Sequence, residues 1–473
     1  MFVFDEKGIE HRIGGLRIAS AGMDTKPDSN GKRNSVKLPK SPFTELGSQY
    51  FSLGMSEKYY DNLKRISPTL KEAVLTGLRD MAFDKDIWEK FKDEDVTTVS
   101  LLRGSSINTV EDQFRRIISG GAVLTPFHFQ FAVPTPVEEK PYEVWFSVKP
   151  EPDTLPTPPT NVHAIIGRNG CGKTFLLRHI AESMIREAST MLWDGIDAPD
   201  RISGLVFIGF SPFDRLHSKI LPGPNTMPFP VVRVSLHDQD AEGIIHVKTP
   251  DELTEEIVES VHECAELGRL DKWQDVMSIL HSDPGFADHR FSKLNSSNKR
   301  KIEKNSLRKI CSGLSSGHKI VLLSLSKLVE STLEKSLVLI DEPETHLHPP
   351  LLSSFVRAVS EIMLDRNGVA ILATHSPVVL QEIARKCVWK LDRFGSTIVA
   401  NRPSIETFGE NVNTLTREVF SYEVSKSGFH QLLLQAVKEC DSFDSVMRKF
   451  KNQLGGEAQA IVRGHMARKL DLE

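Results

Sequence analysis

Residues 162–174 read Val-His-Ala-Ile-Ile-Gly-Arg-Asn-Gly-Cys-Gly-Lys-Thr, an apolar run followed by a glycine-rich turn. The order G-x-x-x-x-G-K-T is that of a phosphate-binding loop, whose backbone N–H groups surround a phosphate while the next helix points its N-terminus at the same anion. The apolar run predicts a strand and residues 175–180 predict a helix, a context that a chance glycine-rich turn lacks. We therefore expect ATP to bind at this loop.

Each residue type in the loop has a chemical purpose. Lys173 is expected to reach the β- and γ-phosphates, and the Thr174 hydroxyl to ligate Mg²⁺. Cys171 is either a bystander or a thiol whose modification blocks nucleotide binding. The expected nucleotide-binding residues of the loop are Gly167, Arg168, Asn169, Gly170, Cys171, Gly172, Lys173 and Thr174.

A second stretch, residues 336–348, supplies the carboxylates that the loop lacks. It reads Ser-Leu-Val-Leu-Ile-Asp-Glu-Pro-Glu-Thr-His-Leu-His, in which four apolar residues predict a short buried strand. Asp341 at the strand end is expected to hold Mg²⁺, and Glu342 to polarise the attacking water. Ligands bind at the carboxyl ends of strands in open parallel sheets, so this stretch and the loop are expected to meet.

Two more segments have less specific patterns. Leu314-Ser315-Ser316-Gly317-His318 precedes a helical pattern, where hydroxyl and N–H donors can serve a γ-phosphate or simply cap the helix. Within residues 369–377, another apolar run predicts a strand that ends at Thr374-His375. A histidine at a strand end is usually structural, but its order after Asp341 and Glu342 favours a catalytic role.

In this order the four motifs resemble an ATP-binding-cassette ATPase of the Rad50, RecF and OLD-type branch. The resemblance implies a composite site in which Lys173, Thr174, Asp341, Glu342 and His375 of one protomer face the segment 315–318 of another across ATP. Ser316 and His318 depart from the family signature. His348 falls where many cassettes carry the D-loop aspartate, and Ser211 or Asp214 would replace an absent Q-loop glutamine.

The flanking segments 50–54, 101–124 and 406–412 are similar to those of Septu-type PtuA anti-phage ATPases, which also occur in some retron systems. That resemblance implies a separate HNH-nuclease partner.

Composition restricts the class of protein further. The chain has 473 residues and five cysteines without a C-x-x-C pair, which favours a reducing cytoplasm and argues against a zinc site. Neither a membrane-spanning run nor a secretory leader is evident, so we expect a cytoplasmic protein without a membrane partner.

The net charge of −4 does not demand a nucleic-acid partner, yet two clusters of cations can contact phosphates. The alternative for both clusters is a solvated face or a mobile loop. The clusters comprise Lys32, Arg33, Lys37 and Lys40, and Lys293, Lys299, Arg300, Lys301, Lys304, Arg308 and Lys309.

The chain is expected to be an α/β protein with a mixed sheet flanked by helices. Residues 1–120 are predicted to be irregular and then helical, 121–402 to form the ATPase domain with a helical insertion at about 250–310, and 403–473 to form a helical extension. Residues 123–133 and 142–148 read as strands of an antiparallel subsheet. No heptad pattern runs long enough for a Rad50-type coiled coil.

These patterns favour an ATPase that dimerises around ATP and controls a separate effector nuclease in phage defence. A RecF-like DNA repair clamp and a scaffold that binds ATP without turnover are the alternatives. The chain shows no carboxylate triad and no H-N-H arrangement of its own, so we expect no nuclease activity from this chain alone.

Overall fold

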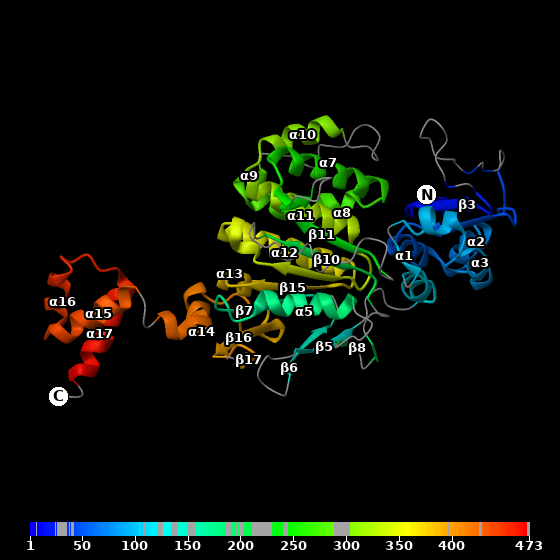
Figure 1. Ribbon diagram of the computed structural model, residues 1–473. Coiled ribbons are helices and arrows are strands. Elements are labelled where there is room, and N and C mark those ends of the chain that lie inside the picture. The colour runs from blue at the N-terminus through cyan, green and yellow to red at the C-terminus, as the bar shows by residue number, and fades with distance from the viewer. Residues whose placement is uncertain are drawn as a thin grey trace.

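The computed structural model describes three successive parts of the chain: a small N-terminal unit, a central α/β domain and a group of C-terminal helices (Figure 1). The residues outside the described part are 6, 24, 26–35, 37, 39–41, 104, 108, 121–125, 134–140, 150–157, 186–190, 194–195, 198–201, 211–228, 240–244, 288–302, 396, 425–427 and 471–473. Ser211, Asp214 and most of both basic clusters fall among these residues.

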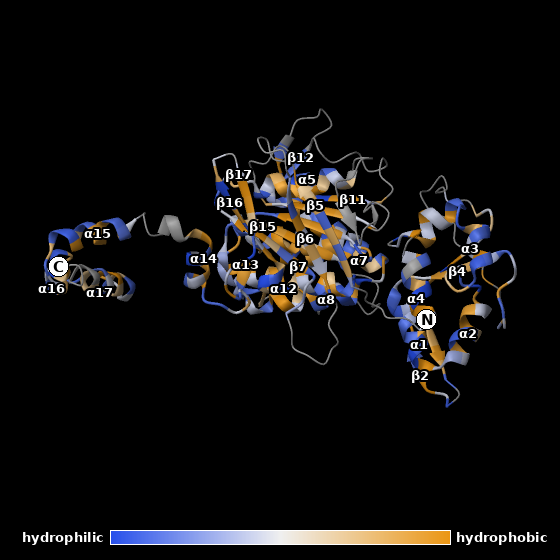
Figure 2. Ribbon diagram, turned by 90° about the horizontal axis from the view of Figure 1, so that it is seen from below, coloured by the Kyte–Doolittle hydropathy of each residue, from blue (hydrophilic) through white to orange (hydrophobic). Residues whose placement is uncertain are grey.

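A seven-stranded sheet forms the centre of the molecule, and hydrophobic residues concentrate on it (Figure 2). Six strands are parallel, and only the edge strand β17 is antiparallel to its neighbour. In order across the sheet, the strands are β11 (Val231–Ser235), β10 (Leu205–Gly209), β14 (Leu337–Asp341), β15 (Val369–Thr374), β7 (Val162–Gly167), β16 (Val388–Phe394) and β17 (Thr397–Asn401). Because β14, β15 and β7 are neighbours and parallel, their carboxyl ends meet at one edge. The expected α/β fold of a P-loop ATPase is confirmed.

One face of this sheet is covered by α5 (Lys173–Ile185) and a smaller antiparallel sheet. The phenylalanines of the smaller sheet pack with α5 in one hydrophobic core. Along β5, buried residues alternate with half-buried ones. The strand order is β6 (Tyr142–Val148), β5 (Phe127–Val133), β8 (Met191–Trp193) and β9 (Ile196–Asp197). The antiparallel pairing predicted for these segments is therefore confirmed.

Helices cover the opposite face and form a second core. They are α7 (Pro250–Glu266), α8 (Leu270–Ile279), α11 (Ser316–Ser331) and α12 (Pro349–Asp365). A capping box fixes the start of α7, because Thr249 and Glu252 bond reciprocally to each other's backbone N–H groups. The short α9 (Pro284–Ala287) and α10 (Lys304–Ser312) complete the helical segment that precedes the signature.

The N-terminal unit contains strands as well as helices. The expectation of an irregular start is wrong for residues 2–20, which form β1 (Phe2–Phe4), β2 (Glu10–Arg12) and β3 (Leu16–Ser20). The last of these pairs with β4 (Tyr50–Gly54), about 30 positions further along the chain. Around them pack α1 (Glu57–Ile66), α2 (Pro68–Gly77), α3 (Lys85–Phe91), α4 (Arg115–Ile118) and the π-helical turns Thr97–Leu101 and Thr109–Phe114.

The C-terminal segment is helical, as predicted. It contains α14 (Val412–Val424), α15 (Phe429–Glu439), α16 (Phe443–Lys449) and α17 (Gly456–Leu470). The last three share a small core of their own and lie beside the central domain rather than within it (Figure 1). Within the described residues, every helix is too short or too polar to cross a bilayer.

Candidate nucleotide site

The predicted phosphate loop joins β7 to α5, as its sequence requires. Gly170 and Gly172 have φ angles of +76° and +105°, values that residues other than glycine rarely adopt. Gly167 serves a different need, since a Cβ there would lie 2.4 Å from the carbonyl oxygen of Leu391 in β16. The three glycines therefore shape the loop and let the neighbouring strand approach it, so residues 167–174 fit a bound phosphate chain.

Lys173 and Cys171 differ in what they offer to a nucleotide. The ammonium of Lys173 is buried and donates to the carbonyl oxygens of Gly167 and Arg168, at 2.9 and 3.0 Å. The Cys171 side chain points into the core against α5, where burial raises the pKa of its thiol although Lys173 opposes that shift. A protonated, buried thiol favours the bystander interpretation, and only the backbone of Cys171 can serve a phosphate.

Asp341 and Thr174 meet at the carboxyl edge of the sheet. Thr174 Oγ1 donates to Asp341 Oδ1 over 3.2 Å, and the Asp341 side chain is buried. A hydroxyl and a carboxylate in contact are the pair that holds Mg²⁺ beside the phosphates in P-loop ATPases. The two residues that the sequence proposed as metal ligands, 167 positions apart, are brought together by the fold.

Glu342 follows in a strained backbone conformation. Its φ and ψ are 47° and 57°, in the left-handed region, and its N–H bonds to the carbonyl of Ala373 in β15 at 2.9 Å. A non-glycine residue in that region costs about 1–3 kcal/mol, which the surrounding structure must offset. Strain of this kind is common at functional sites, and here it sets the direction of the Glu342 side chain.

His375 is held by a carboxylate that the sequence reasoning missed. Glu344 Oε1 accepts from the His375 backbone N–H at 2.5 Å and lies 3.0 Å from its Nδ1. The same oxygen accepts from the Thr374 hydroxyl at 2.8 Å. The second acidic residue of Asp-Glu-Pro-Glu was the available signal. Glu344 fixes the end of β15 and the ring of His375 together.

The signature segment begins α11, on the face of the sheet opposite α5. Ser315 caps the helix, accepting the His318 N–H at 3.4 Å, and its hydroxyl lies 2.5 Å from His318 Nδ1. Gly317 is required by packing, because a Cβ would meet the His346 carbonyl oxygen at 2.6 Å. Ser316 is exposed. The helix-cap interpretation is therefore satisfied within one chain, while the exposed start of α11 remains open to a second.

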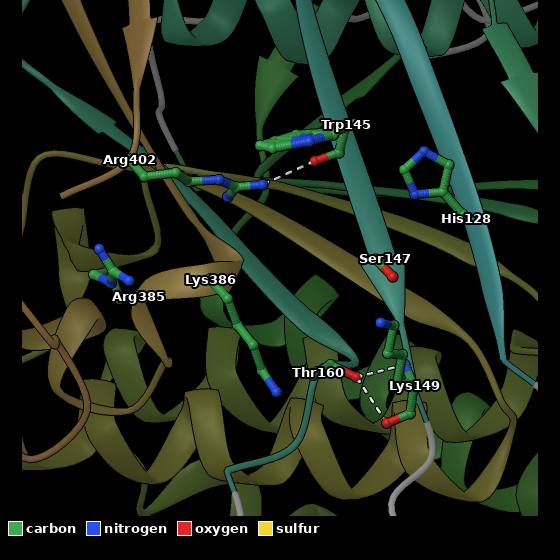
Figure 3. Close-up of a pocket in the computed structure, with 8 residues that line it drawn as sticks. All are labelled: His128, Trp145, Ser147, Lys149, Thr160, Arg385, Lys386 and Arg402. Carbon is green, nitrogen blue, oxygen red and sulfur yellow. Dashed lines mark hydrogen bonds between the residues drawn. The ribbon is translucent and has the colours of Figure 1, made fainter.

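A separate basic cavity of about 400 Å³ lies at the other edge of the sheet (Figure 3). Thr160 precedes β7, Arg385 and Lys386 precede β16, and Arg402 follows the antiparallel β17, so all lie at the amino edge. The guanidinium of Arg402 lies 4.3 and 3.8 Å from the ring centroids of Trp145 and Trp389. The residues that line the cavity are His128, Trp145, Ser147, Lys149, Thr160, Arg385, Lys386 and Arg402.

Little of the predicted basic clusters falls within the described residues. Lys304, Arg308 and Lys309 lie on α10, where Arg308 forms a bidentate pair with Glu255 at 2.6 and 2.7 Å. That pairing uses the Arg308 charge within the chain. The cavity at the amino edge therefore gathers cationic side chains within the described part, and the sequence reasoning missed it because its residues come from five separate segments.

Two comparisons with known proteins bear on this site. A family model described as "AAA domain, putative AbiEii toxin, Type IV TA system" matches residues 283–381. The match includes the signature segment, Asp341, Glu342 and His375, and it begins downstream of the phosphate loop. The whole chain is also 33% identical over 492 aligned residues to protein ea59 of Escherichia phage lambda, covering 98% of this chain and 90% of that protein. Together with the sheet, these matches identify a P-loop ATPase domain.

Proposed function

For this chain, which belongs to the family of protein ea59 of Escherichia phage lambda, we propose the role of ATP-binding and ATP-hydrolysing subunit of an anti-phage defence complex that controls a separate nuclease of the HNH type. The observation that carries the proposal is the meeting of Lys173, Thr174, Asp341 and Glu342 at one edge of the parallel sheet. The Septu-type resemblance of the flanking segments supplies the nuclease part of the proposal.

Mg²⁺, when bound, neutralises charge on the β- and γ-phosphates. Thr174 and Asp341 would hold it, since their oxygens already lie 3.2 Å apart. Lys173 exchanges its bonds to loop carbonyls for bonds to phosphate, and Glu342 orients the attacking water. His375, fixed by Glu344, contacts the γ-phosphate side of the site. These groups act mainly by position and charge, which is sufficient for phosphoryl transfer.

The signature segment supports an assembly of two chains. The start of α11 lies on the opposite face of the sheet from α5, and Ser316 is exposed there. A second protomer would present Ser315, Ser316 and Gly317 to ATP bound at the loop of the first. In this assembly His318 acts through Ser315, because its ring is occupied within its own chain.

The effector is proposed to dock outside the ATPase core. In α15, Phe429 and Leu432 are 47% and 59% exposed, although the helix packs its other side in the small C-terminal core. Because these two residues lie three positions apart, they are neighbours on one face of the helix, and contiguous exposed apolar surface is typical of protein-binding sites. The phage origin of the relative fits a role in conflict between phages and their hosts.

The test is recovery of the tagged chain from its native host, with and without ATP, followed by identification of the proteins that accompany it. We expect a nuclease whose cleavage activity changes with nucleotide. Lys173→Ala is the matched control, because it removes the ammonium that binds phosphate while leaving the exposed surface of α15 intact. Recovery of the chain without a nuclease, in both nucleotide states, would contradict the proposal.

The basic cavity favours one alternative, a RecF-like clamp that binds DNA as its main activity. Cations beside an exposed indole form the kind of surface on which single-stranded nucleic acid binds, with bases stacked on the ring. That alternative predicts ATP hydrolysis stimulated by DNA, with the stimulation lost as salt is raised. Trp145→Ala and Lys386→Ala should then reduce stimulation while leaving hydrolysis without DNA unchanged.

A further inference from the structure

Three side chains converge beside the signature segment, apart from the phosphate loop. Asp283 precedes α9, His318 lies in the first turn of α11, and His348 caps α12. His318 Nε2 lies 2.9 Å from Asp283 Oδ1, and His348 Nε2 lies 3.0 Å from Asp283 Oδ2. The donor atoms of all three lie within 4.8 Å of one another. Two imidazoles and a carboxylate thus surround one point.

The Asp283 carboxylate is not satisfied by hydrogen bonds alone. Its side chain is 2% exposed, and its Oδ1 accepts from the Gly285 N–H at 2.8 Å as well as facing His318. Its Oδ2 accepts no hydrogen bond, although His348 Nε2 lies 3.0 Å away. A buried carboxylate oxygen without a donor is costly unless a cation balances it.

The surroundings of His318 match those of a metal-binding histidine. When Nε2 binds an ion, Nδ1 carries a proton and needs an acceptor, and the Ser315 hydroxyl lies 2.5 Å away. The ring also packs edge-on against Phe286 at 5.0 Å between centroids, which fixes its plane. His348 Nδ1 lies 3.4 Å from the Leu351 N–H, so binding through Nε2 costs one long capping contact.

The donor set indicates the class of ion. Two imidazoles and one carboxylate with an open position are typical of Zn²⁺, whereas Mg²⁺ prefers oxygen ligands throughout. Tetrahedral Zn²⁺ with bonds of about 2.0–2.1 Å separates its donor atoms by roughly 3.3 Å, which small rotations of these side chains achieve. His348 is 52% exposed, so a water has access to the fourth position.

We propose that Asp283, His318 and His348 form a second metal site, for a divalent transition ion of the zinc class. The ion joins the helical segment before the signature, the first turn of α11 and the start of α12. It therefore fixes the signature serines relative to the segment that follows Glu342. This proposal rests on the three donor groups alone and does not depend on whether the chain hydrolyses ATP.

The test measures Zn²⁺ bound by the full chain after chelator treatment and reconstitution, with excess Mg²⁺ present to fill the position at Thr174 and Asp341. We expect one equivalent of tightly held Zn²⁺ per wild-type chain, and Co²⁺ in its place to give visible ligand-field absorption. Asp283→Asn and His348→Asn should lose both signals. Asn at position 348 retains a good helix cap, so folding is preserved.

His346→Gln is the matched control, since this exposed histidine lies two residues from His348 and outside the cluster. Ser315→Ala should bind Zn²⁺ about 10–100-fold more weakly, by loss of the partner of His318. Equal Zn²⁺ content in wild type and His348→Asn, with both folded by circular dichroism, would overturn the site. Lys173→Ala should keep the ion and lose ATP, so failure of the metal site and failure of the ATPase proposal are distinguishable.

Discussion

At the candidate nucleotide site, the fold constrains the single residues Glu342 and Lys173. The backbone of Glu342 is left-handed, and its N–H is tied to Ala373, so strand pairing maintains the strain. The ammonium of Lys173 is retained by two loop carbonyls. The first arrangement would fix the Glu342 carboxylate before phosphate arrives, whereas Lys173 is held at the loop and would exchange these carbonyls for phosphate oxygens.

Asp80 makes the N-terminal unit sensitive to pH. Its side chain is fully buried, which raises its pKa to about 7, although the backbone N–H groups of Ala82 and Phe83 and the Tyr60 hydroxyl oppose that shift. The folded chain therefore holds a proton that the unfolded chain releases near pH 3.8. This contribution to stability is fully present below pH 3.8 and is lost as the pH rises through about 7.

We predict that Asp80→Asn flattens this dependence. Between pH 4 and pH 8, the free energy of unfolding of the wild type should fall by up to about 4 kcal/mol more than that of the variant. Urea unfolding at a series of pH values measures the difference. Asp86→Asn, at an exposed position, should follow the wild type. Parallel curves for wild type and Asp80→Asn would show that Asp80 titrates normally.

The individual residues differ in how far the sequence revealed them. The phosphate loop, Asp341 and Glu342 could be predicted because each motif is contiguous and follows an apolar strand. Asp283 could not, since it acts on a histidine 35 positions away that only the packing of α9 on α11 brings near. The pattern at Ser315 is ambiguous for a different reason, because the same residue types are expected both at a helix cap and at a phosphate contact.

Among the elements, α1 connects the N-terminal unit to the ATPase domain. Glu57 at its start pairs with Arg366 after α12 at 3.0 Å, and both side chains are at least nine-tenths buried. Burial alone would lower the pKa of Arg366, but Glu57 and Asp365 raise it. Arg116 and Glu334 form a second bridge at 2.7 Å between the same two parts.

Removing one member of the buried pair should weaken this connection. Arg366→Met leaves Glu57 buried without its partner, for which about 3–5 kcal/mol of destabilisation is expected. Urea unfolding, followed by tryptophan fluorescence, measures the loss. The double variant Glu57→Gln with Arg366→Met should recover much of it. Lys58→Met, which removes a 62% exposed ammonium 3.9 Å from Asp365, should change stability by less than about 1 kcal/mol.

A change of less than 1 kcal/mol in Arg366→Met would mean that the two parts are held by apolar contacts instead.

Elements with a strong local period could be predicted, and those that depend on distant partners could not. The helices α7, α8 and α15 follow apolar periodicity, and along β5 buried residues alternate with half-buried ones. Strands β2 and β3 carry Glu10, Arg12 and Arg17 in short, half-exposed segments. Their strand conformation comes from pairing, and β3 finds its partner beyond a long intervening segment.

At the level of the whole molecule, the proposed assembly divides each ATP site between two chains. The phosphate loop and Glu342 lie at the carboxyl edge of the sheet, while the exposed start of α11 packs on the opposite face from α5. In the proposed assembly, a second chain related by symmetry would close the site, so that each chain contributes its signature segment to the ATP of the other. Nucleotide binding and assembly are therefore expected to be one event.

Sedimentation of Glu342→Gln with and without Mg²⁺ and ATP tests this expectation most directly. The substitution keeps the loop and removes the carboxylate that orients water, so ATP stays bound and hydrolysis slows by orders of magnitude. The mass should double on adding ATP, and the additional change Lys173→Ala should prevent it. An unchanged mass in a variant that binds ATP tightly would contradict a site shared between two chains.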